Sequence, residues 1–199
     1  PGTQLVFLYL YYAENTGSVN LTQIAKALSL SKATCTRAIN DLSASGLISQ
    51  TAEGTNKWIT TAYTKSELLE KAYGRLKTPV DRILYVKGTA QIEHPIASGI
   101  RALARQSMIG VNDQDGAIAI SKKEAAKIPA EDICTKQYFE DFGGAVIEVW
   151  SYDPIILERD GCVDDISLLL SMDNDPNERV QTCLDEIRQK HGLPIKEEE

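Results

Sequence analysis

The sequence predicts an α+β chain with a smaller helical part that ends in a β-hairpin, followed by a larger part that alternates strands and helices. Helix-capping signals and apolar residues at helical spacing dominate residues 1–77, and short β-branched runs separate helical segments over 78–199. The charge of the chain also divides at this point. We therefore expect one domain over 1–77 and a second, α/β domain with a small sheet over 78–199.

The charge division concerns the kind of partner. Residues 1–77 carry eight basic and five acidic side chains, a balance of +3, whereas the remaining 122 residues carry 13 and 23, a balance of −10. Such asymmetry indicates a part that faces nucleic acid, joined to an acidic part with another task. The longest apolar run, Leu5–Ala13, has nine residues against the ~20 that a spanning helix needs, so a membrane protein is excluded.

Capping signals define the helices of the first part. Leu5–Tyr12 is apolar and aromatic, and we interpret it as a helix because helices follow it. Asn20 and Gln23 fit a capping box at the start of the next helix. After a short break, Ser31 is an N-cap for a helix that runs to about Ser45 and stops at a glycine. Two short helices joined by a tight turn form a helix-turn-helix.

The helix over 31–45 has two different faces. At 100° per residue, one face is apolar and should pack into the core, with Cys35, Ala38, Ile39 and Leu42. The opposite side and the N-terminus carry Ser31, Lys32, Ala33, Thr34, Thr36, Arg37 and Asn40. Small residues permit close approach to a duplex, hydroxyls bind phosphates, and Arg and Asn read purine edges. An ordinary solvated helix face is the alternative.

A hairpin follows this helix directly. Gly46–Gln50 is predicted as a strand, Ala52–Asn56 as a turn and Lys57–Thr60 as the returning strand. A hairpin in this place is the wing of a winged helix. We expect its tip, Thr55, Asn56 and Lys57, to touch the DNA backbone.

The order of these motifs resembles a known family. Ala-x-x-Leu, then Ser-Lys-Ala-Thr-Cys-Thr-Arg-Ala-Ile-x-x-Leu, then Gly-Leu-Ile, within residues 4–77, resembles the winged helix of MarR-type transcriptional regulators. The resemblance implies groove-facing positions at Ser31, Thr34, Thr36 and Arg37. Family wings often carry several Arg or Lys, whereas this turn has Lys57 beside the acidic Glu53. Because +3 is a small charge, we expect a homodimer on double-stranded DNA whose binding is sensitive to salt.

The rest of the chain alternates strands and helices. Ser66–Lys77 is amphipathic, and its apolar stripe fits either the core or a dimer seam. The predicted strands are Arg82–Val86, Ala117–Ile120 and Ala145–Tyr152. The predicted helices are Ile96–Met108, a segment from Ser121 to near Pro129, a short one at Asp153-Pro154, Asp164–Met172, and one from a cap at Asp175–Glu178 to about His191.

The acidic residues of this part invite a metal-site interpretation. Glu148, Asp153, Asp164 and Asp165 resemble a carboxylate set for metal catalysis. Asp173-x-Asp175-x-Asn177 imitates a calcium loop but lacks the loop's later glycine and glutamate. Several of these residues are explained by a structural role as helix caps, so we expect no catalytic residue, metal or cofactor. Four cysteines without a C-x-x-C pair, with only two histidines and no signal peptide, predict reduced, buried thiols in a cytoplasmic protein.

A second resemblance covers parts of 80–190. Ser-Gly-Ile-Arg-Ala-Leu at 98–103 and Ala-Ile-Ala-Ile-Ser-Lys-Lys-Glu at 117–124 look like the C-terminal part of AbiEi-type antitoxins of abortive-infection systems. Those proteins also join a winged helix to an α/β domain and repress their own operons. The resemblance implies a second domain that binds a protein partner or a small-molecule effector and is not an enzyme.

Two function hypotheses follow. The first is a sequence-specific DNA-binding regulator, a repressor acting as a dimer, with the helix over 31–45 in the major groove. The alternative is an antitoxin that autoregulates its operon and counteracts a nucleotidyltransferase-like toxin through its second domain.

Overall fold

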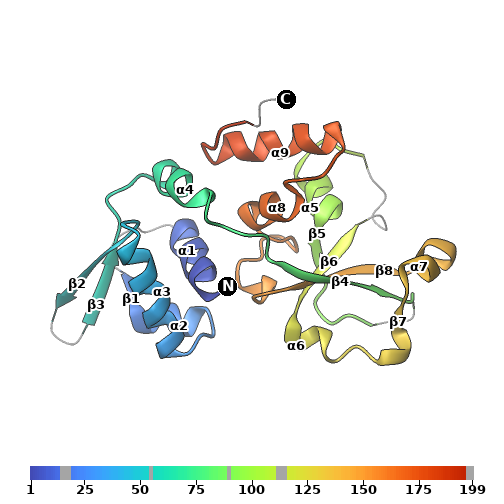
Figure 1. The fold of residues 1–199 in the computed structure, drawn as a ribbon, viewed down its shortest axis with the longest axis horizontal. Helices are drawn as coiled ribbons and strands as arrows, with labels where there is room; N and C mark the ends of the chain where they lie inside the picture. The colour runs from blue at the N-terminus through green and yellow to red at the C-terminus, as the bar shows by residue number, and fades with distance from the viewer. Residues whose placement is uncertain (14–18, 54–55, 89–90, 111–115, 196–199) are drawn as a thin grey trace. The chain divides into compact units, whose positions relative to one another are not determined.

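The computed structural model describes residues 1–13, 19–53, 56–88, 91–110 and 116–195 (Figure 1). It divides into two compact units. The first unit comprises Pro1–Leu76 together with Gln189–Pro194. The second unit comprises Lys77–Arg188 and, at the end of the described chain, Ile195. Helices and strands occur in both units, which confirms the predicted α+β class.

The first unit is a helical domain with a small antiparallel sheet. Its elements are α1 (Gly2–Tyr12), β1 (Val19–Asn20), α2 (Leu21–Ala27), α3 (Lys32–Ala44), β2 (Ser49–Glu53), β3 (Asn56–Thr60) and α4 (Lys65–Tyr73). The strand order is β1-β3-β2. The capping box at Asn20 and the N-cap at Ser31 are confirmed, and Gly46 takes the expected left-handed conformation with φ at 75°.

The wing hairpin differs from its prediction in length. β2 begins at Ser49, not at Gly46, and it pairs with β3 from Ser49↔Thr60 to Glu53↔Asn56. Residues 52, 53 and 56, predicted as turn, are therefore strand. Cross-strand pairing extends both strands toward the tip, a tertiary effect that turn-forming residue types do not reveal. Residues 54–55 lie outside the described part of the chain.

The core of the first unit is built on α1. Its residues Leu5–Leu8 are buried, and so are Leu68, Leu69 and Ala72 of α4. The apolar stripe of the predicted Ser66–Lys77 helix therefore packs within this unit, as its core interpretation requires. The last described segment completes the unit, because the Tyr11 hydroxyl and His191 Nδ1 share a hydrogen bond of 2.7 Å.

The second unit contains a mixed sheet. In the described residues its strands are β4 (Val80–Val86), β5 (Ile96–Ser98), β6 (Ala117–Ser121), β7 (Ile133–Cys134) and β8 (Ala145–Trp150), in the order β5-β6-β8-β4-β7. β6 and β8 are parallel, and the other pairs are antiparallel. The helical elements are α5 (Gly99–Gln106), α6 (Lys122–Ala125), η1 (Ala130–Asp132), α7 (Lys136–Phe142), η2 (Pro154–Ile156), α8 (Asp165–Met172) and α9 (Glu178–Lys190).

The two faces of this sheet bury different side chains. Ile118, Ile120, Ile147 and Val149 form a hydrophobic cluster with Ala125 of α6. Because successive strand residues point to opposite faces, Glu148 and Trp150 lie on the other face. Figure 1 shows α5 and α8 on one side of the sheet and α6 on the other.

Three predictions for the second unit need correction. Ile96–Ser98 was predicted as the start of a helix, but it is strand β5, because pairing with β6 captures this apolar run before the left-handed Gly99 (φ 54°). The helix opened by Ser121 ends at Ala125, well before Pro129. The sequence interpretation also missed β7 and α7, although Thr135 caps α7 through the Tyr138 N–H.

Candidate nucleic-acid interface

Helix α3 has one buried and one exposed face. Its buried residues are Cys35, Ala38, Ile39 and Leu42, as the 100° spacing predicted. Lys32, Ala33, Arg37 and Asn40 are exposed, and Thr36 is half-buried. Arg37 and Asn40 are three positions apart and therefore lie next to each other on the helix surface.

The first turn of α3 uses its hydroxyl groups internally. Ser31 Oγ accepts a hydrogen bond of 3.1 Å from the Thr34 N–H and shares a second one, of 2.9 Å, with Thr34 Oγ1. The Thr34 methyl faces α1, since a Cβ on Gly2 would lie 3.1 Å from Thr34 Cγ2. Thr34 thus braces the start of the helix against α1. Ser31 is exposed, so its hydroxyl remains accessible.

A contact with the wing holds Asn40, which the sequence interpretation did not foresee. Gln50 of β2 donates from Nε2 to Asn40 Oδ1 at 3.3 Å. The bond fixes the orientation of the Asn40 amide, with one carbonyl lone pair occupied and its NH₂ donors left to face outward. The only sequence signal was the alternation of β2, which sets Gln50 two residues after the buried Ile48.

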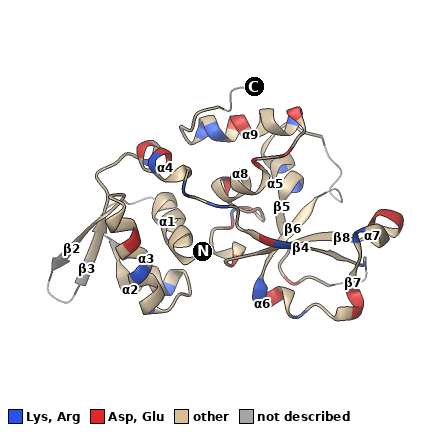
Figure 2. Cartoon of the chain, in the orientation of Figure 1, with Lys and Arg blue, Asp and Glu red and all other residues tan. Residues whose placement is uncertain are grey.

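The basic groups of this face are available for a ligand. Within the described residues, the charged groups of Lys32 and Arg37 have no hydrogen-bond or ion-pair partner. The acidic residue of the helix, Asp41, accepts a hydrogen bond of 3.1 Å from Thr3 Oγ1 on α1. Figure 2 shows basic and acidic positions on α3, and α2 carries one basic residue, Lys26.

The predicted wing residues are described only in part. Asn56 and Lys57 lie at the start of β3, where their backbones pair with Glu53 and Ala52. Thr55 lies outside the described residues. The hairpin that carries these residues starts five residues after α3 ends, which is the order of a winged helix.

Three of the four acidic residues considered as a metal set have separate structural tasks. Glu148 is 9% exposed and accepts a hydrogen bond of 3.0 Å from Trp150 Nε1, and burial raises its pKa. Asp153 accepts from the Ile155 N–H at 3.2 Å and Asp164 from the Ser167 N–H at 3.0 Å, so both cap helices as predicted. In the described parts of the chain, no three His, Cys, Asp or Glu side chains gather in a metal-binding group.

The residues that imitate a calcium loop are also engaged. Asp173 and Asp185 each accept a hydrogen bond of 2.6 Å from Arg188, whose side chain is 2% exposed. Asp175 accepts from the Asn177 N–H at 2.9 Å. The sequence interpretation did not identify Arg188, because the fold brings it to Asp173 across 15 residues.

The four cysteines are free thiols, and the prediction that they are buried is only partly right. Cys35 and Cys162 are buried, whereas Cys134 and Cys183 are half-buried. Burial raises the pKa of the Cys35 thiol on the core face of α3, so this thiol stays protonated and packs as an apolar group.

Comparison with known proteins finds a match to part of the first unit. Residues 3–57 match the model of the MarR family, whose members are DNA-binding transcriptional regulators. The match covers the segment from α1 to the start of β3 and supports a MarR-type winged-helix regulator. Neither the curated proteins nor the solved structures give a significant match. Among the described helices, none has the length and apolar character needed to cross a membrane.

Proposed function

We propose that this protein is a sequence-specific transcriptional repressor that inserts α3 into the major groove of DNA. One observation carries the proposal: α3 buries its apolar face completely and leaves Lys32, Arg37 and Asn40 exposed on a segment that matches DNA-binding regulators. In the described residues Arg37 has no acidic partner, and it lies beside an amide that Gln50 orients. DNA offers both phosphates and base edges to such a surface.

Each residue of this surface has a proposed role. Ser31 and Lys32 bind phosphates, Thr34 and Thr36 line the groove, and Arg37 and Asn40 read bases. Thr34 contributes less than the others, because its methyl packs toward α1. Thr55, Asn56 and Lys57 touch the backbone from the wing.

The small charge of the first unit makes dimerisation part of the proposal. A single winged helix with two or three phosphate contacts has a salt slope of about −2 to −3, which is typical of weak binding. A dimer doubles the contacts and reads two half-sites about one helical turn apart. We propose that residues 1–77 form the DNA-binding domain. We propose that residues 78–199 form a second domain for dimerisation, partner binding or effector binding.

Fluorescence anisotropy with DNA from upstream of the gene tests this function. We expect saturable binding, with a log–log salt slope of about −4 to −5, and a dimer in analytical ultracentrifugation. A monomer that fails to shift upstream DNA at low salt would refute the proposal. In cells that produce the protein, a decrease in reporter expression from that upstream region identifies a repressor, and an increase identifies an activator.

An antitoxin remains a second candidate, favoured by one surface feature. The rings of Tyr138 and Phe142 on α7 lie 4.8 Å apart, and Phe142 is 74% exposed. Exposed aromatic pairs are typical of protein interfaces. This candidate requires a neighbouring gene for a nucleotidyltransferase-like toxin, and co-expression must restore growth with the wild-type chain but not with Phe142→Ser. A chain that binds its upstream DNA and rescues no toxin is a regulator alone.

A further inference from the structure

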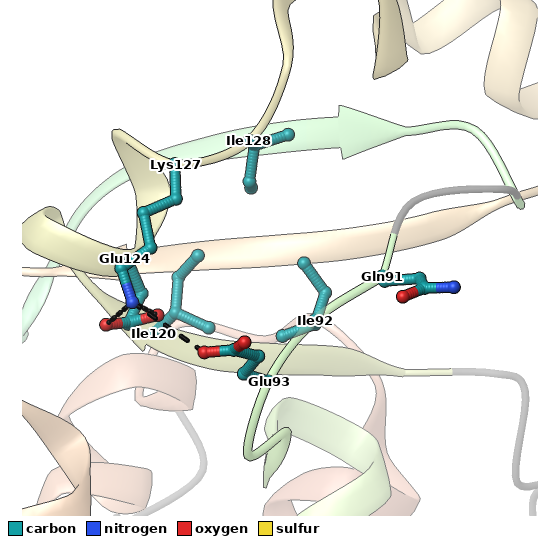
Figure 3. A pocket seen from close by; sticks show the side chains of 7 residues that line it. All are labelled: Gln91, Ile92, Glu93, Ile120, Glu124, Lys127 and Ile128. Atoms are coloured by element: carbon teal, nitrogen blue, oxygen red, sulfur yellow. Dashed lines mark hydrogen bonds and ion pairs between the residues drawn. The ribbon is translucent and has the colours of Figure 1, made fainter.

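A pocket opens on the α6 side of the sheet in the second unit. It has a volume of about 190 Å³. Three isoleucines line it, Ile120 from β6, Ile128 from the turn after α6 and Ile92 from the segment before β5 (Figure 3). Gln91, Glu93, Glu124 and Lys127 complete its lining. The pocket therefore combines an apolar interior with a charged rim.

The apolar interior belongs to the hydrophobic cluster of the sheet. Ile120 is 3% exposed and is part of that cluster, and Ile92 and Ile128 pack against it half-buried. A cavity of about 150 Å³ lined by aliphatic side chains binds benzene. The volume here is slightly larger, so one six-membered ring with a short head group fits its size.

The rim determines the charge of that head group. Lys127 Nζ lies 2.8 Å from Glu124 Oε1 and 3.7 Å from Glu93 Oε2 (Figure 3). The lining thus holds two carboxylates and one ammonium, a balance of −1. Because the Glu124 hydrogen bond and both carboxylates raise the pKa of Lys127, the ammonium remains charged and engaged.

A bound anion would have to draw Lys127 away from two carboxylates that it already contacts. A bound cation can pair with the carboxylate of Glu93. This carboxylate lies farther from Lys127 Nζ than that of Glu124, and the Glu93 side chain is 76% exposed. The two carboxylates therefore favour a positively charged ligand.

We propose that this pocket binds a small apolar molecule with one cationic amine, its ring or short aliphatic body against Ile92, Ile120 and Ile128 and its ammonium beside Glu93. This site lies within the second unit and does not depend on the function proposed for α3. It gives the second unit a ligand class of its own.

Isothermal titration calorimetry of the full chain with three probes of equal ring size tests the site. The probes are benzylammonium, benzyl alcohol and benzoate, which differ in head-group charge. We expect saturable binding of benzylammonium in about the millimolar range, weaker binding of benzyl alcohol and the weakest binding of benzoate. Benzoate binding as tightly as benzylammonium, or no saturable binding of benzylammonium, overturns the proposal.

Two variants locate the binding. Ile92→Phe fills the pocket from a half-buried position and should abolish benzylammonium binding, whereas Ile155→Phe, at a residue 51% exposed elsewhere in the unit, should leave it unchanged. Glu93→Gln should weaken benzylammonium about two- to fivefold and leave benzyl alcohol unaffected. Its matched control is Glu140→Gln, where the glutamate pairs with Lys136 at 3.5 Å.

If Ile92→Phe fails to fold, the exposed variant Glu93→Gln still decides the test. Equal benzylammonium binding by Glu93→Gln and the wild-type chain overturns the cationic assignment. Unchanged binding by a folded Ile92→Phe overturns the location. Neither result concerns DNA, so failure of the site and failure of the proposed function are seen in separate experiments.

Discussion

Charged side chains on α3 of the first unit differ in burial and pairing from a set of charged side chains in the second unit. On α3 of the first unit, Lys32 and Arg37 are exposed and, among the described residues, have no partner for their charged groups. In the second unit, Glu148 is buried against Trp150, and Asp173 and Asp185 hold Arg188. A surplus of ten acidic charges in the second part of the sequence therefore does not by itself indicate a metal site. The two basic residues on one helix face support the DNA-binding site that we propose on α3.

The difference shows that the partners of a charged group indicate a functional site better than the number of charges does. A carboxylate that caps a helix or pairs with a buried Arg has its hydrogen bonds satisfied, and it offers little to a metal or a substrate. The exposed Arg37 lies beside the Asn40 amide, which Gln50 of β2 orients, and its guanidinium donors can bind a ligand. Four substitutions test this contrast.

The largest expected effect is on Arg188, whose removal breaks the paired network of the second unit. Arg188→Met leaves Asp173 and Asp185 without their shared partner. Losing one member of a buried pair costs about 3–5 kcal/mol, and because these carboxylates are 33% and 23% exposed, we expect about 2–3 kcal/mol. Urea unfolding followed by Trp150 fluorescence in a Trp58→Phe background measures it.

Arg179→Met, on the exposed side of the same helix, is the control for Arg188 and should change the unfolding free energy by less than about 0.5 kcal/mol. Equal effects of the two substitutions would mean that the network adds nothing to stability. DNA binding by the Arg188 variant at low temperature should be retained.

Arg37 tests the unengaged group of the first unit. Arg37→Ala should reduce affinity for the specific site about 5- to 150-fold, corresponding to about 1–3 kcal/mol, and should relax specificity at one base position. Thermal unfolding should be unchanged, because the Arg37 side chain has no hydrogen-bond or ion-pair partner in the described part of the chain. Arg75→Ala removes the same charge from a position after α4 and should affect binding far less. A loss by the same factor on every sequence would mean that Arg37 binds only phosphate.

Glu148 tests whether the buried carboxyl is purely structural. Its folded-state pKa is raised above the ordinary 4.5, so the folded chain holds the proton more tightly than the unfolded chain. Unfolding free energy should therefore fall as the pH rises from about 4.5 through the raised pKa. Glu148→Gln keeps the acceptor for Trp150 Nε1 and should remove this decline. A decline of equal size in the variant would assign it to other groups.

Gln50 gives the smallest and sharpest test, because it acts on DNA only through Asn40. Gln50→Ala should weaken specific binding about two- to threefold, the worth of a lost exposed hydrogen bond of about 0.5 kcal/mol. In an Asn40→Ala background the same substitution should have no further effect. Additive losses in this double-mutant cycle would show that Gln50 contacts DNA on its own.

The sequence predicted the first unit well because its signals are local. The caps at Asn20 and Ser31, the left-handed Gly46 and the buried face of α3 depend on residues within a few positions of one another. The site residues on α3 came from the same periodicity. The Gln50–Asn40 bond did not, because it joins two elements and depends on where the wing lies against the helix.

Predictions for the second unit failed where pairing decides the structure. Ile96–Ser98 has a pattern that suits helix or strand, and pairing with β6 and with the segment around Cys162 makes it a strand. The two-residue β7 has no sequence pattern of its own, since its pairing with Tyr85 and Val86 defines it. Helix α7 is a different case: its cap at Thr135 and the left-handed Gly143 were readable local signals.

The hydrogen bond between Tyr11 and His191 bears on how the chain is made. Because residue 11 is translated about 180 residues before its partner, this hydrogen bond can form only after the second unit has been synthesised. The first unit is thus the earliest to begin folding and among the last to be completed. A nascent chain that stalls before Gln189 carries α3 in a first unit that still lacks residues 189–194.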